Sequence, residues 1–205
     1  MQSQRRGWHS GSDTYFVMVM LTIPGLVRLF PHTGPGTAGM LVDLASLTGD
    51  ATIQSLKNGI GMEQRPRRIA PFLDQWFVSR MNRIRPVPDI DRIAAAHSIL
   101  RRGGTVETAA ETAQLSRRQL HRLFHRHLGV SPKELADLER LHSSLQSVQS
   151  GRGEPVEGFS DQAHQIRSWR RRLGTTPGAY AHAPRTPLAN HFDANGSTLE
   201  VAYYL

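Results

Sequence analysis

Three helical segments follow one another between residues 89 and 129, separated by very short turns. Each segment begins after a residue type that caps helix N-termini, and two of them end at glycine, which closes helices readily. The caps are Asp89, Thr105 and Ser116, and the closing glycines are Gly103-Gly104 and Gly129. A short helix, a tight turn and a longer helix predict a helix-turn-helix over about residues 105–128, with Ala110 as the small residue where the helices cross.

The third segment, RRQLHRLFHRHL at residues 117–128, has two chemically different faces. Its apolar stripe, spaced by three and four residues, must face a core and consists of Leu120, Leu123, Phe124 and Leu128. The opposite face carries Arg117, Arg118, His121, Arg122, His125 and Arg126. No acid occurs between Glu111 and Glu134. A face of donors suits a groove lined by phosphates and base acceptors, although a solvated basic face is the alternative.

Net charge alone does not locate that surface. The chain has 25 Lys and Arg against 17 Asp and Glu, for a net charge of +8, which favours an anionic partner such as nucleic acid or an anionic membrane face. Residues 86–184 hold 14 basic and 10 acidic residues, whereas residues 1–85 hold 10 and 5. The placement of arginine within acid-free helices is therefore more informative than the total.

Several classes of protein are disfavoured by composition. The absence of cysteine excludes disulfides, thiolate metal sites and a cysteine nucleophile. His121 and His125 stand four residues apart and could share a metal, but arginines flank both rings, so we expect no metal site and no cofactor. The longest apolar run, Tyr15–Ile23, is shorter than the roughly 20 residues of a membrane span. Arg5-Arg6 precede that run, but no cleavage motif follows, so we expect a cytoplasmic location and no membrane partner.

The stiff segment Arg85-Pro86-Val87-Pro88 predicts a domain boundary, because neither proline can continue a helix. Before it, residues 1–85 predict a short, incomplete α+β region with strands at Tyr15–Ile23 and Val27–Phe30 and a helix over 71–84 that starts at Pro71. After it, residues 86–184 predict a helical domain, followed by a tail at 185–205. The predicted fold class is mainly α.

From Asp89 to Tyr180 the chain resembles the DNA-binding domain of AraC/XylS-type bacterial transcription regulators. The most specific part is GFSDQAHQIRSWRRRLGTTPGAYAH, where Gly158-Phe159-Ser160-Asp161, Trp169 and Leu173-Gly174-x-Thr176-Pro177 follow the family pattern. Leu128-Gly129-x-Ser131-Pro132 is its counterpart in the first unit. The resemblance implies two helix-turn-helix units, the second at about 156–182, joined by a linking helix at about 133–149.

The resemblance implies duplex DNA as the partner, RNA polymerase as a further expected partner, and no catalytic residue; the effector stays unknown. Base-reading positions of the first unit fall on Arg118, His121 and Arg122, with Ser116 and Arg117 near phosphate and His125 as a further donor. In the second unit they fall on Gln162, His164, Ile166 and Arg167, with Arg170, Arg171 and Arg172 toward phosphate. The N-terminal region corresponds to a truncated sensor domain. Its predicted strand has no sheet neighbour in this chain, so pairing with a second copy in a homodimer is an open alternative.

Three departures from the family pattern put function in question. Between Gly153 and Gly158 a whole bracing helix is missing, so Trp169 is expected to lose packing partners. Gln165 replaces an apolar core residue, and Gln114 replaces the glycine of the first turn. These departures motivate an alternative: a remnant that acts through protein interaction or non-specific DNA binding, without a specific operator.

Overall fold

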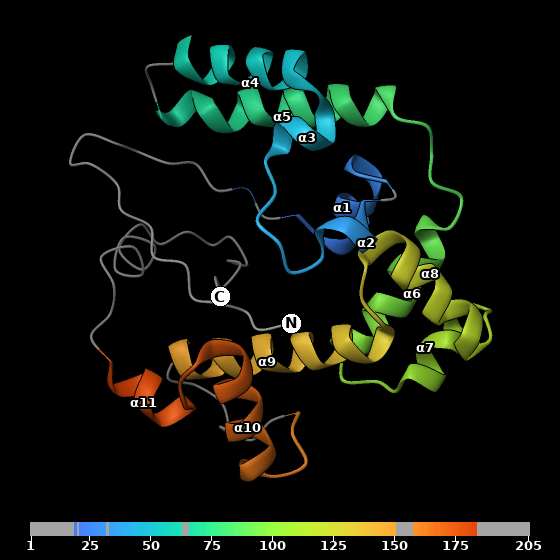
Figure 1. Ribbon diagram of the computed structural model, residues 1–205, viewed down its shortest axis with the longest axis vertical. Coiled ribbons are helices and arrows are strands. Elements are labelled where there is room, and N and C mark those ends of the chain that lie inside the picture. The colour runs from blue at the N-terminus through green and yellow to red at the C-terminus, as the bar shows by residue number, and fades with distance from the viewer. Residues whose placement is uncertain (1–18, 20, 32, 63–65, 151–157, 184–205) are drawn as a thin grey trace. The chain divides into compact units, whose positions relative to one another are not determined.

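The computed structural model describes residues 19, 21–31, 33–62, 66–150 and 158–183. Eleven α-helices follow one another in these residues, and no strand occurs among them (Figure 1). Contacts between Cα atoms divide the chain into two compact units. The first is Leu21–Leu135, called the N-terminal unit below, and the second, called the C-terminal unit, contains the described residues from Ala136 onward.

The predicted α+β character of the N-terminal region is wrong for its described part. Val27–Phe30, predicted as a strand, lies in and just after helix α1 (Ile23–Leu29). Thr22 caps this helix through its side chain, which accepts a hydrogen bond from the Gly25 amide at 3.2 Å. A short apolar run reads equally well as a buried strand or a buried helix turn, and here the cap and Pro24 in the first turn favour the helix. Most of the other predicted strand, Tyr15–Ile23, lies outside the described residues.

A helical hairpin follows in the N-terminal unit. The short helices α2 (Gly34–Thr37) and α3 (Leu44–Thr48) lead into α4 (Asp50–Met62) and α5 (Pro66–Arg83), which lie side by side (Figure 1). The helix predicted to start at Pro71 starts five residues earlier, and Pro71 lies inside it. Arg80 of α5 donates a hydrogen bond to the Leu29 carbonyl at 3.3 Å. Its guanidinium also lies over Phe30, 5.4 Å from the ring centre, and so ties α5 to the end of α1.

The predicted helix-turn-helix is present in the same unit. Helix α6 (Ile90–Arg101) precedes α7 (Val106–Thr112) and α8 (Arg117–Leu128), and Thr105 and Ser116 cap α7 and α8 as the sequence predicts. Ala110, the small residue predicted at the crossing of the two helices, is buried, with 2% of its surface exposed. Gln114 adopts a φ of 54°, so it occupies the left-handed conformation that glycine would take more easily in this turn. The unit continues through the predicted linker at 85–88, because α1 packs against α6; the domain assignment itself stays a prediction.

Helix α2 contacts the C-terminal end of α8 through two glycines. Gly129, which ends α8 with a φ of +71°, lies so close to Gly34 that a Cβ on either residue would clash with backbone atoms of the other segment. A Cβ on Gly129 would also lie 2.8 Å from the Cβ of Ala38. The two backbones therefore approach as closely as they do only because both residues lack side chains.

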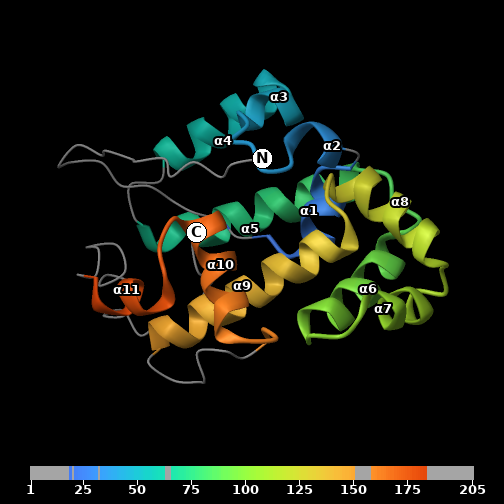
Figure 2. The ribbon, with the colours of Figure 1, turned by 60° about the horizontal axis from the view of Figure 1, so that its bottom comes forward.

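The C-terminal unit is built around one tryptophan. Trp169 of α10 (Gln162–Leu173) is fully buried against Leu141 and Leu145 of α9 (Pro132–Ser150). Its ring makes an edge contact, 5.7 Å between ring centres, with Tyr180 of α11 (Pro177–His182). The expected loss of packing at Trp169 is therefore wrong, because the linking helix α9 supplies the apolar surface. Figure 2 shows α10 beside α9 from a second direction.

A buried polar network completes this core. Ser144 of α9 accepts hydrogen bonds from Gln165 Nε2 at 2.8 Å and from Trp169 Nε1 at 3.0 Å. Gln165, noted in the sequence as a polar residue at a core position, is 1% exposed and is paired rather than unsatisfied. One serine thus satisfies two buried donors, 21 and 25 residues further along the chain.

We expect Ser144→Ala to lower the free energy of unfolding by about 1–3 kcal/mol, because both buried donors lose their acceptor. Ser143→Ala is the matched control, since Ser143 is the exposed neighbour on the same helix and the same hydroxyl is removed. Urea unfolding followed by circular dichroism compares the two variants. Equal midpoints would show that Ser144 does not act as the shared acceptor.

Candidate nucleic-acid interface

Helix α8 is capped at both ends by residues of this segment. The Ser116 hydroxyl accepts a hydrogen bond from the Gln119 amide at 3.3 Å, and the Gln119 side chain accepts one from the Ser116 amide at 2.8 Å. This capping box satisfies donors that the first turn would otherwise leave free. At the other end Gly129 donates its amide to the His125 carbonyl. Backbone groups at both ends of the helix are therefore satisfied within the chain.

The two faces predicted for α8 are present in the structure. Leu120, Leu123, Phe124 and Leu128 are buried. The predicted site residues on the other face, Arg117, Arg118, His121, Arg122 and His125, are all exposed, as is Arg126. His127 is 3% exposed and belongs to the buried stripe, because it follows Leu120 by seven residues and Leu123 by four. The helix therefore presents a face of donors opposite a buried apolar face.

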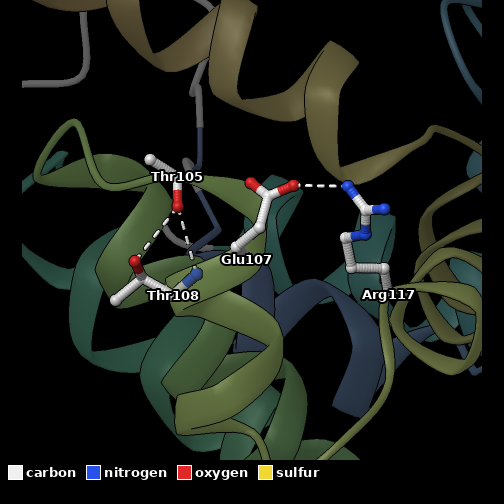
Figure 3. Close-up of polar contacts among 4 residues, drawn as sticks. All are labelled: Thr105, Glu107, Thr108 and Arg117. Atoms are coloured by element: carbon white, nitrogen blue, oxygen red, sulfur yellow. Dashed lines mark hydrogen bonds and ion pairs between the residues drawn. The ribbon is translucent and has the colours of Figure 1, made fainter.

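Arg117 is paired with an acid that the sequence did not single out. Its guanidinium donates to the Glu107 carboxylate at 2.6 Å, linking the first turn of α8 to the first turn of α7 (Figure 3). Backbone hydrogen bonding at Glu107, followed by the hydrogen bond from Arg117, lowers the pKa of this carboxyl. The only sequence signal is an acid two residues after the Thr105 cap, a position that acids often take for helix-dipole reasons alone.

An open groove lies next to this ion pair. Its volume is about 380 Å³, and it is lined by Val106, Arg117, His121, Ser131, Pro132 and Lys133. Ser131 and Glu134 form a second capping box at the start of α9. The Ser131 amide donates to the Glu134 carboxylate at 2.7 Å, and the Glu134 amide donates to the Ser131 hydroxyl at 3.1 Å. The groove thus brings Lys133, which the sequence reasoning left out of the site, to the same surface as two predicted site residues. Three of its six lining side chains can carry positive charge.

Helix α10 presents a second basic face, in the C-terminal unit. Asp161 caps the helix by accepting from the His164 amide at 2.7 Å, and this bond lowers the pKa of its carboxyl. His164 is half-buried, and its ring lies edge-on to Phe159 at 5.5 Å. The remaining predicted residues of this helix, Gln162, Arg167, Arg170 and Arg171, are exposed, whereas Ile166 and Arg172 are half-buried. His164 is therefore held by its neighbours, and the arginines are the accessible donors.

Among the residues that the structure describes, no three His, Cys, Asp or Glu side chains gather closely enough to hold a metal ion. No helix in the described ranges is both long and apolar enough to cross a membrane.

Comparison with known proteins gives one match. Neither the curated proteins nor the solved structures contain a match to this chain. Residues 109–183, which run from α7 to the end of α11, match the model of the family described as a helix-turn-helix domain. The chain therefore carries an AraC-like helix-turn-helix domain in this range, of the kind that binds DNA in transcription regulation.

Proposed function

We propose that this protein is a sequence-specific regulator of transcription that reads the major groove of DNA mainly through α8, without catalysing a reaction. The observation that carries the proposal is the exposed row of Arg118, His121 and Arg122 on a helix whose opposite face is buried. Arginine can donate two hydrogen bonds to a guanine edge, and a capped helix of 12 residues can enter the major groove.

Fewer observations support base reading by the second helix-turn-helix than by the first. The family match extends over it, and Gln162 and Arg167 are exposed on α10. His164, however, is held between Phe159 and the Ser160 hydroxyl, which lies 3.2 Å from its Nδ1. We therefore propose that α10 contributes mostly phosphate contacts through Arg170 and Arg171. A homodimer and a contact with RNA polymerase remain predictions.

We expect Arg122→Ala to weaken binding to the preferred duplex by about 1–3 kcal/mol, and to relax the preference at one base pair. The preferred duplex is first selected from a random pool with the full chain, and affinities are then measured by gel shift at fixed salt. The selected sequences are expected to contain a guanine at the position whose preference the variant loses.

Arg126→Ala is the matched control, because Arg126 is an exposed arginine on the same helix outside the predicted base-reading positions. Both variants lose one positive charge, so both weaken binding to random DNA similarly. If Arg122→Ala and Arg126→Ala lose affinity equally on every sequence, α8 does not read bases. A selection that yields no preferred sequence would instead support the non-specific remnant.

A further inference from the structure

The ion pair between Glu107 and Arg117 lies on the surface proposed to meet DNA. Arg117 stands at the first position of α8 and also lines the groove with His121 and Lys133. An anion that enters the groove must therefore compete with the Glu107 carboxylate for the same guanidinium. The exposed fractions of the two side chains, 71% for Arg117 and 54% for Glu107, leave both accessible to DNA.

Such a pair can exchange partners easily. Ion pairs between exposed side chains contribute little to stability, because water screens them and both side chains lose freedom in forming them. A phosphate oxygen offers the same kind of acceptor as a carboxylate and binds arginine in the same two-point geometry. Under the proposed function, α8 seated in the major groove would place a phosphate beside Arg117 and so allow this exchange.

We propose that Glu107 is a specificity-determining residue that withholds Arg117 from phosphates until α8 is seated on its preferred sequence. This inference rests on the proposed function. In a loosely bound, non-specific complex the pair stays closed, so Arg117 neutralises no phosphate and the Glu107 charge repels the backbone. In the seated complex a phosphate replaces the carboxylate at Arg117. Glu107 thereby lowers affinity for arbitrary DNA more than affinity for the preferred site.

The proposal predicts that Glu107→Gln changes the salt dependence of binding on random DNA but not on the preferred duplex. Glu107→Gln should strengthen binding to a random duplex roughly fivefold near physiological salt, and steepen the dependence of log affinity on log salt by about 0.9, the contribution of one added phosphate contact. On the preferred duplex the salt dependence should stay unchanged. Titrations of fluorescent duplexes by the full chain at several salt concentrations measure both quantities.

Two further variants separate this role from a general loss of acidic charge. Glu111→Gln removes the same charge from an exposed acid on the same helix, one that the structure does not pair with Arg117, and should leave the salt dependence unaltered. Adding Arg117→Gln to Glu107→Gln should abolish the gain on random DNA, because the released guanidinium is gone. A gain that persists in the double variant, or one that Glu111→Gln reproduces, would overturn the proposal.

The random-duplex measurements need no preferred sequence, so they test the ion pair even if the proposed function fails. Absence of any selected sequence would refute base reading and, with it, a role of Glu107 in specificity. An unchanged salt dependence of Glu107→Gln on random DNA would refute the release of Arg117 while leaving base reading by Arg122 intact. The two failures are thus distinguishable.

Discussion

Trp169→Ala is expected to lower the free energy of unfolding of the C-terminal unit by about 3–5 kcal/mol, the usual cost of deleting a large buried aromatic side chain. Trp169 has no exposed surface, packs on Leu141 and Leu145, and donates its indole N–H to Ser144 at 3.0 Å. The substitution removes the central side chain of this core and one of the two donors to Ser144. Chemical unfolding by circular dichroism, combined with limited proteolysis and mass spectrometry, should show cleavage confined to residues 136–183.

Trp169→Phe is the companion variant, since it keeps an aromatic ring in the core and removes the indole N–H. We expect a smaller cost than for alanine, because most of the apolar contact survives and the Ser144 hydroxyl still accepts from Gln165. If Trp169→Ala unfolds at the same denaturant concentration as the unmodified chain, the packing of Trp169 on α9 does not stabilise the C-terminal unit. The expected packing deficit at Trp169 would then be correct after all.

The local part of the fold could be predicted because caps act over three or four residues. Thr105, Ser116 and Gly129 each place one helix end, and the structure puts α7 and α8 at the positions that these residues indicate. The exposed row on α8 followed from the same reasoning, because the apolar stripe leaves only one face for the arginines. These predictions needed no knowledge of the rest of the chain.

The features that the sequence did not predict depend mostly on contacts between residues far apart in the chain. The hydrogen bond between Gln165 and Ser144 joins positions 21 residues apart. From the sequence alone Gln165 is therefore an unpaired polar residue at a core position, although its side chain has a hydrogen-bond partner in the structure. Val27–Phe30 was misread as a strand because a short apolar run has no decisive period. Glu107 was missed because its partner Arg117 lies across a turn, ten residues away. Local patterns carry no information about which of many acids and arginines will meet.

Gly129→Ala is expected to lower the free energy of unfolding of the N-terminal unit by about 2–5 kcal/mol, in two parts. A left-handed φ costs a non-glycine residue about 1–2 kcal/mol, and a side chain forced into a filled space typically costs about 1–3 kcal/mol more. Gly129 has a φ of +71°, and its Cβ would clash with the Gly34 carbonyl. Urea unfolding by circular dichroism measures the total.

Gly174→Ala separates the two parts, because Gly174 ends α10 with a φ of +68° and an added Cβ there meets nothing within 4 Å. Its cost reports the backbone conformation alone, so the excess at Gly129 reports the contact with α2. Gly34→Ala should reproduce that excess without any left-handed strain, whereas Gly36→Ala in the same short helix should cost little, since its Cβ also meets nothing within 4 Å. Equal costs at Gly129 and Gly174 would mean that α2 does not contact the end of α8. An excess at both Gly129 and Gly34 would show that the segment before the predicted boundary at 85–88 supports α8, because α2 packs directly on the glycine that ends this helix.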